Sequence, residues 1–187
     1  GGIIAITLDE GDSLVNVLLT DGTQEIILAT KNGLAVRFHE SQCRPIGRSG
    51  RGVCGITLKG DDEVISMVGA DPQKTVLTIT EHGYGKRTAL EEYRLINRGG
   101  IGVINIQCSD RNGPVVAVAA VTDEDDIMLI SQAGITIRIP AKTISVIGRN
   151  TQGVRLMRLE DNDVIVACAK IAREEAVGIH ASPEQSL

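Results

Sequence analysis

Short apolar runs, separated by turns rich in glycine or acidic residues, follow one another from about residue 3 to residue 172. Ile4–Leu8 alternates apolar and polar positions, whereas Leu14–Leu18 is a more continuous apolar run. β-Branched residues dominate, and no stretch shows the 3.6-residue period of an amphipathic helix. The pattern therefore predicts an all-β protein made of short strands.

The same pattern recurs about every 50 residues. The motif Gly-x-x-x-Arg occurs three times, at Gly33 and Arg37, Gly83 and Arg87, and Gly134 and Arg138. A further arginine keeps the same offsets, at Arg48, Arg98 and Arg149. Three complete units therefore span about 3–52, 53–102 and 103–153, and a fourth begins at Val154 and ends near Lys170.

Each unit predicts four strands. In the first unit these are Ile4–Leu8, Leu14–Leu18, Ile26–Thr30 and a fourth strand after Gly33, whose turn suits the positive φ of a hairpin. Four-stranded units of about 50 residues are typical of blades, which bury their faces only against neighbouring blades. We therefore expect one propeller-like domain over residues 1–172 and a flexible tail over 173–187.

The charge of the chain is unevenly distributed along the repeat. The net charge of −5 taken alone argues against a polyanionic partner. The windows 31–52, 81–102 and 132–153, however, hold 12 of the 19 basic residues and only four acids, a net charge of +8. The rest of the chain carries −13.

These windows cover the fourth strand of each unit and its connection to the next. Because a repeat places equivalent residues on equivalent edges, they predict a basic rim that neutralises the phosphates of duplex DNA. Solvated loop charges, or arginines that brace the connections, are the structural alternative. The candidate DNA-binding residues are Lys31, Arg37, Arg44, Arg48, Arg51, Lys86, Arg87, Arg94, Arg98, Arg138, Lys142 and Arg149.

Glycine-rich connections within the windows are a second signal. Gly47–Gly52, Asn97–Gly102 and Gly148–Gly153 each lead into a strand, so they are not dinucleotide-binding fingerprints. Glycines allow the backbone to approach an anion closely, and they also allow a tight crossover between blades. We expect both roles.

Other chemistry has little support in the sequence. We find no catalytic triad, Walker loop or metal-ligand spacing, and we expect neither catalytic nor metal-binding residues. Asp123–Asp126 is interpreted as a solvated acidic turn, and Tyr84 and Tyr93 occupy apolar columns of the repeat and should pack. The cysteines Cys43, Cys54, Cys108 and Cys168 are expected to be small buried hydrophobes in a reducing compartment.

Three stretches resemble the C-terminal domain of the DNA gyrase A subunit, part of a bacterial type IIA topoisomerase. They are Glu81–Thr88, Asn97–Ile104 and Ile147–Val154, and the resemblance extends over about residues 2–172. It implies a β-pinwheel, in which neighbouring blades exchange strands. Complete domains of the family have six blades, so this chain would supply three or four, as a piece of a longer polypeptide.

The resemblance also implies a function. Such a domain binds and wraps duplex DNA on a basic perimeter, so that an A2B2 assembly introduces negative supercoils with ATP. Cleavage belongs to the N-terminal core of the gyrase A protein and ATP hydrolysis to the gyrase B protein, so this chain would be non-catalytic and hold no cofactor, with ATP and Mg²⁺ used elsewhere. A cytoplasmic, nucleoid-associated location without membrane contact follows. Arg48–Gly52 is only a degenerate version of the family's wrapping signature, which predicts weaker DNA binding.

Two alternatives remain open from the sequence. The chain could be the matching domain of topoisomerase IV, which steers substrate choice, or a protein-interaction propeller without a nucleic-acid role. The charge distribution and the lack of Trp-Asp repeats disfavour the second alternative. If the rim arginines bind DNA, replacing Arg37, Arg87 and Arg138 together by Glu should weaken binding without unfolding the chain.

Overall fold

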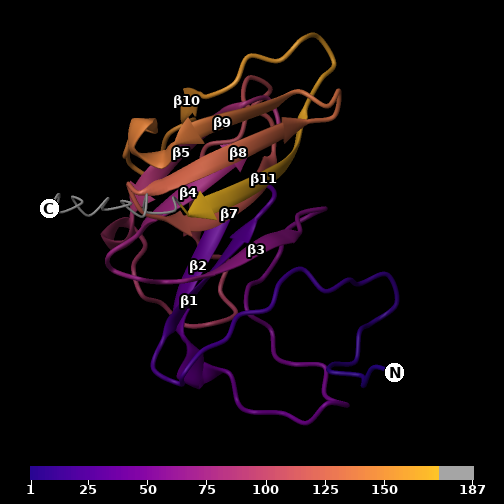
Figure 1. The fold of residues 1–187 in the computed structure, drawn as a ribbon. Helices are drawn as coiled ribbons and strands as arrows, with labels where there is room; N and C mark the ends of the chain where they lie inside the picture. The colour runs from indigo at the N-terminus through magenta and orange to yellow at the C-terminus, as the bar shows by residue number, and fades with distance from the viewer. Residues whose placement is uncertain (173–187) are drawn as a thin grey trace, which may run out of the picture.

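The computed structural model describes residues 1–172. Within this part of the chain, short strands alternate with turns and with single-turn 3-10 helices (Figure 1). The strands are β1 (Glu25–Thr30), β2 (Leu34–His39), β3 (Val64–Gly69), β4 (Thr75–Thr80), β5 (Tyr84–Ala89), β6 (Val103–Ile104), β7 (Val115–Val121), β8 (Asp125–Ser131), β9 (Thr136–Pro140), β10 (Val154–Arg155) and β11 (Ile165–Ala172). The 3-10 helices are η1 (Glu40–Gln42), η2 (Leu90–Glu92) and η3 (Ala141–Thr143).

The strands form three antiparallel sheets, which we call blades A, B and C. Blade A has the strand order β3-β1-β2-β6, blade B has β10-β5-β4-β7, and blade C has β11-β8-β9. The middle of each blade is the hairpin predicted from the sequence, β1–β2, β4–β5 or β8–β9. The all-β, propeller-like architecture is therefore confirmed for residues 1–172.

A sequence unit and a blade do not coincide, which corrects the expected one-unit blade. β3, from the second unit, pairs with β1, while β6, from the third unit, pairs with β2 on the other side of the hairpin. Blade B repeats this arrangement with β7 and β10. Each unit therefore supplies one strand to the preceding hairpin and one to the hairpin before that, which is the strand exchange of a β-pinwheel.

Three expected strands are absent from the described residues: Ile4–Leu8 and Leu14–Leu18 of the first unit, and the first strand of the second unit, at about 53–58. By the pairing rule above, their partners would be hairpins of units that precede the first one, and this sequence contains no such units. Ile4 and Val17 are each 74% exposed as a result. Strand formation here depends on a partner rather than on the local apolar pattern.

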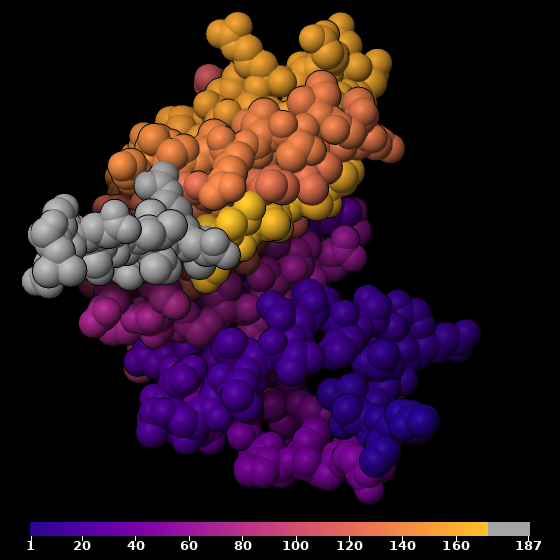
Figure 2. Space-filling view, in the orientation of Figure 1, coloured from indigo at the N-terminus to yellow at the C-terminus, as the bar shows by residue number. Residues whose placement is uncertain are grey.

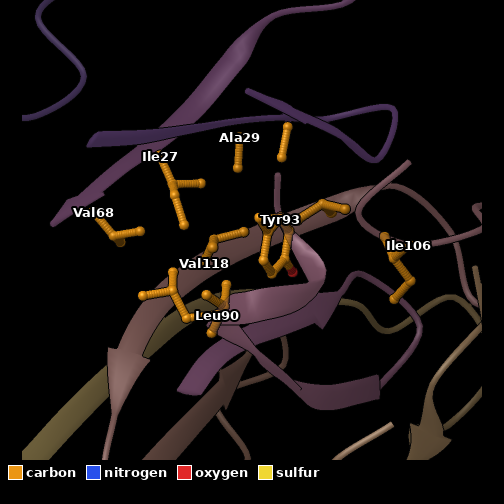
Figure 3. Packing of buried hydrophobic residues seen from close by; sticks show 10 residues of the cluster. Ile27, Ala29, Val68, Leu90, Tyr93, Ile106 and Val118 are labelled. Carbon is orange, nitrogen blue, oxygen red and sulfur yellow. The ribbon is translucent and has the colours of Figure 1, made fainter. Parts of the chain in front are cut away.

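The core lies between successive blades. Strand β7 contacts both β3 and β11, so these three strands form the inner edges of the blades, and β6 and β10 lie on the outer edges. Figure 3 shows Tyr93 packed among Ile27, Val118 and neighbouring apolar residues from blades A and B. The blades succeed one another in chain order through the molecule (Figure 2). The predicted packing role of Tyr93, which is 1% exposed, is confirmed.

Candidate nucleic-acid interface

Two of the glycine-rich connections, Asn97–Gly102 and Gly148–Gly153, lead into the outer-edge strands of blades A and B. After η2, Leu95 forms a parallel bridge with Arg37 of β2, and the chain then continues into β6, which also pairs with β2. After η3, Val146 forms a parallel bridge with Arg87 of β5, and the chain then continues into β10, which also pairs with β5. Parts of the second and third basic windows therefore lie beside the outer edges, whereas the strands β2 and β5 in the first and second windows lie inside their blades.

The glycines of these connections are required by the fold. Gly102 has a φ of +85°, and a Cβ atom there would lie 2.3 Å from the carbonyl oxygen of Ala35. Gly153 makes the equivalent approach to Gly85 in blade B. The tight-crossover role is thus confirmed, and a contact of these glycines with an anion stays a prediction.

Arg98 and Arg149 hold neighbouring connections together through hydrogen bonds to backbone carbonyl oxygens. Nε and Nη1 of Arg98 donate to the carbonyl oxygens of Gln42 (3.1 Å) and Cys54 (2.5 Å). Arg149 makes the same pair of bonds to Glu92 (2.5 Å) and Ile104 (2.6 Å), each about 50 residues further along. This repeated arginine braces one blade crossover against the preceding one, which is the structural alternative left open by the sequence.

Arg37 and Arg87 join each hairpin to the next blade. Arg37 pairs with Glu25 at 2.5 Å and donates to the carbonyl oxygen of Tyr93 at 2.9 Å. Arg87 pairs with Asp123 at 2.6 Å and donates to the carbonyl oxygen of Ile144 at 2.9 Å. Arg87 is only 6% exposed. These two arginines are therefore occupied by contacts that hold blades together.

Arg138 occupies the same register in blade C. It pairs with Asp126 at 2.8 Å, as Arg37 pairs with Glu25, but its side chain is 53% exposed. It remains accessible to a partner in a way that Arg37 and Arg87 are not.

Lys86 is fully buried, which removes it from any surface. Its ammonium group donates to the carbonyl oxygens of Gly148 (2.8 Å) and Arg149 (2.7 Å) and to the hydroxyl of Thr151 (3.1 Å). Burial, followed by the charge of Arg149, lowers the pKa of Lys86 to about 8. The side chain fills the loop 148–152 and orders it.

The remaining candidates differ in how free their charges are. Lys31 lies 3.4 Å from Glu63, and Arg51 lies 2.8 Å from Asp9. Four are exposed and, within residues 1–172, form no ion pair: Arg44, Arg48, Arg94 and Lys142. We call these four the open rim cations.

A cluster that the sequence reasoning missed lies at the start of β5. Tyr84 is 3% exposed and packs, as predicted, but its hydroxyl accepts hydrogen bonds from Arg111 (3.2 Å) and Arg155 (2.8 Å). Both arginines lie outside the basic windows. The available signal was the tyrosine itself, since Leu34 and Ile135 occupy its register in the other units.

Two other predictions are partly wrong. Cys43 and Cys54 are exposed, whereas Cys108 and Cys168 are partly buried, and burial raises the pKa of the Cys168 thiol to about 11. Within Asp123–Asp126, Asp125 and Asp126 are buried in β8. Asp125 accepts a bond from the backbone N–H of Thr122, and Asp126 accepts one from Arg138. Only the first half of this segment is a solvated turn.

Residues 1–172 contain no cluster of three or more His, Cys, Asp or Glu residues suited to a metal ion. None of the helices in that range has the length and apolar character needed to cross a membrane. The expected flexible tail, 173–187, lies outside the described residues.

The family model described as the DNA gyrase C-terminal domain, beta-propeller, matches residues 1–21, 24–69, 74–122 and 125–172. The chain belongs to this family. It is 57% identical over 175 residues to the DNA gyrase A protein of Halalkalibacterium halodurans, which covers 94% of the chain and 21% of that protein. It is 47% identical over 185 residues to the DNA gyrase A protein of Clostridium acetobutylicum, covering 99% of the chain and 22% of that protein.

Solved structures agree with this assignment to the gyrase C-terminal domain family. The C-terminal domain of DNA topoisomerase IV matches with a TM-score of 0.85 and 27% identity, covering 90% of the chain and 53% of that structure. A DNA gyrase A C-terminal domain matches with a TM-score of 0.83 and 29% identity, covering 90% and 58%. The chain spans about a fifth of the length of its gyrase A relatives.

Proposed function

We propose that this domain binds duplex DNA along the outer edges of its blades and wraps it for a DNA gyrase. The observation that carries the proposal is the exposure of the open rim cations, which lie on or beside the connections that follow the hairpins of a gyrase-family domain. Unpaired exposed cations displace the counterions of DNA when they contact phosphates. Arg44 and Arg94 share one register, so successive blades offer the same charge to a strand that follows the edge.

The domain itself performs no bond-breaking step in this proposal. The parent gyrase A protein cleaves DNA in its N-terminal core, and ATP and Mg²⁺ act in the gyrase B protein of an A2B2 assembly in the bacterial cytoplasm, at the nucleoid. Wrapping by this domain gives the passage of the second DNA segment its handedness. The similarity to a topoisomerase IV domain supports one competing function, in which the same edge selects the DNA substrate without wrapping it.

A salt series with the intact gyrase A protein tests DNA binding. If the four open rim cations each neutralise one phosphate, they contribute about 3.6 to the steepness with which the logarithm of the association constant falls with the logarithm of salt concentration. Replacing Arg44 and Arg94 together by Gln should reduce the steepness by about 1.8. The matched control replaces Lys59 and Lys74, which lie outside the basic windows, by Gln and should leave the slope unchanged. Salt-independent binding would contradict the proposal.

A topology assay separates wrapping from substrate selection. The reconstituted A2B2 enzyme with ATP should introduce negative supercoils into relaxed plasmid. Loss of the edge charges should reduce supercoiling while leaving relaxation of supercoiled plasmid. An enzyme that relaxes plasmid but never supercoils it would assign the domain to the topoisomerase IV type of function.

A further inference from the structure

Two arginines converge on one tyrosine hydroxyl in blade B. Tyr84 begins β5 and Arg155 lies opposite it in β10, while Arg111 comes from the turn 109–113. The guanidinium carbons of both arginines lie 5.3 Å from the centre of the Tyr84 ring. The phenol thus positions two cations through hydrogen bonds and cation–π contacts.

The two arginines of this cluster form no direct ion pair in the part of the chain that the structure describes. Within residues 1–172, neither Arg111 nor Arg155 pairs with a carboxylate. Each guanidinium has five N–H donors, of which one bonds to the phenol, so several donors remain. The hydrogen bond from Arg111, followed by that from Arg155, lowers the pKa of Tyr84, in keeping with a locally positive environment. Two like charges held together are suited to an anion.

The cluster departs from the repeat in each of its members. Leu34 and Ile135 replace Tyr84 in the other hairpins, and Ile104 holds the register of Arg155 in β6. Arg111 lies in the turn that contains the extra residue of the third unit. Blade A packs with aliphatic residues at these positions, so blade packing does not require an Arg-Tyr-Arg cluster.

The cluster borders a hollow of about 730 Å³. Its other lining residues include His82 and Arg158 and the carboxylates of Glu160, Asp161 and Asp163. These carboxylates repel a free phosphate dianion more than a singly charged phosphodiester. Arg155 also ends the outer-edge segment that begins at Gly148, so the hollow is continuous with the edge proposed to carry DNA.

We propose that Arg111 and Arg155, positioned by Tyr84, bind a phosphodiester group of duplex DNA. This inference rests on the proposed function and adds a contact in blade B that the repeated rim does not provide. Arg111 and Arg155 make the contact directly, and Tyr84 is a positioning residue.

The experiment compares DNA affinity and its salt dependence in the intact gyrase A protein. The double variant Arg111→Gln and Arg155→Gln should bind duplex DNA about tenfold more weakly and reduce the steepness of the salt dependence by about 0.9, the value for one phosphate. Lys59→Gln with Lys74→Gln is the control of equal charge change and should alter neither. Tyr84→Phe should weaken binding with an unchanged slope, because both charges remain.

The outcomes separate the two proposals. If the wild-type protein binds DNA with a steep salt dependence but the double variant behaves like the lysine control, the cluster is not a DNA contact and the proposed function stands. If the wild type fails to bind, both are overturned. Thermal unfolding checks that the double variant is folded, and Arg111→Gln alone serves if it is not, since Arg111 is exposed in a turn.

A competition arm tests the source of the phosphate. Inorganic phosphate at constant ionic strength should displace DNA no better than chloride does. Saturable displacement by inorganic phosphate from the wild type, and not from the double variant, would assign the cluster to a free phosphate and overturn the DNA assignment.

Discussion

Replacing Arg87 by Glu should destabilise the domain rather than only weaken DNA binding. Arg87 is 6% exposed, and its Nε donates to the carbonyl oxygen of Ile144 at 2.9 Å. The ion pair with Asp123 contributes little by itself, because the Asp123 side chain is 69% exposed. The buried charged hydrogen bond is worth about 1.5–3 kcal/mol, and the variant adds a buried carboxylate without a partner.

We therefore expect Arg87→Glu to lower the free energy of unfolding by about 3–5 kcal/mol. This is a large share of the roughly 5–15 kcal/mol that stabilises a typical domain. Arg87→Met keeps much of the apolar stem and should cost about 2 kcal/mol. Arg94→Glu makes the same charge change at an exposed site and should stay within about 0.5 kcal/mol of wild type.

Urea unfolding followed by far-UV circular dichroism measures these differences. The order of midpoints should be wild type and Arg94→Glu, then Arg87→Met, then Arg87→Glu. Equal midpoints for Arg87→Glu and Arg94→Glu would refute the structural role of Arg87 and would indicate that its side chain is accessible to DNA. The triple Glu variant expected from the sequence to remain folded should fail for the same reason.

Two further predictions concern a glycine pair and pH. Gly83 and Gly134 both have a φ of +87°, but a Cβ on Gly83 would lie 2.3 Å from the carbonyl oxygen of Met157, whereas Gly134 faces open space. Gly83→Ala should therefore lower the thermal midpoint clearly more than Gly134→Ala, and equal losses would show that only φ matters. The folded pKa of Lys86, about 8, lies below the unfolded value of 10.5, so stability should rise with pH above about 8. Stability should fall above about pH 10, because burial raises the pKa of Tyr93 in the folded state and the unfolded phenol then loses its proton first. Urea midpoints measured across this pH range check both changes. Lys86→Met should flatten the rise in stability above about pH 8.

The sequence predicts the hairpins of the fold well because their signals are local. Gly83 lies in the turn between β4 and β5, and the apolar pattern of 76–80 is complete within one element. The exchange of strands could not be predicted from the residues alone, since a repeat does not specify which unit pairs with which. The strand β3 has the same apolar pattern whether it pairs with the hairpin of its own unit or with the preceding hairpin.

The sequence predicts which basic residues share a register of the repeat, but it does not predict which of them are exposed. The repeat places Arg87 and Arg94 in the same basic window, but only the structure shows that Arg87 is buried and Arg94 is exposed. A residue that recurs once per blade is expected equally for a repeated ligand and for a repeated structural contact. Tyr84, Arg111 and Arg155 were missed because they are distant in sequence and do not recur.

Strand exchange also sets the order in which the blades can be completed while the polypeptide is being synthesised. Leu34 pairs with Ile104, about 70 residues later, and Gly85 pairs with Val154 over a similar separation. At roughly 5–20 residues per second, a nascent hairpin waits about 4–14 s for its last strand to leave the ribosome. During that interval its edge is unpaired, and such long-range pairing folds slowly. The blades are therefore expected to mature on the ribosome in chain order, each one completed two units behind the growing end.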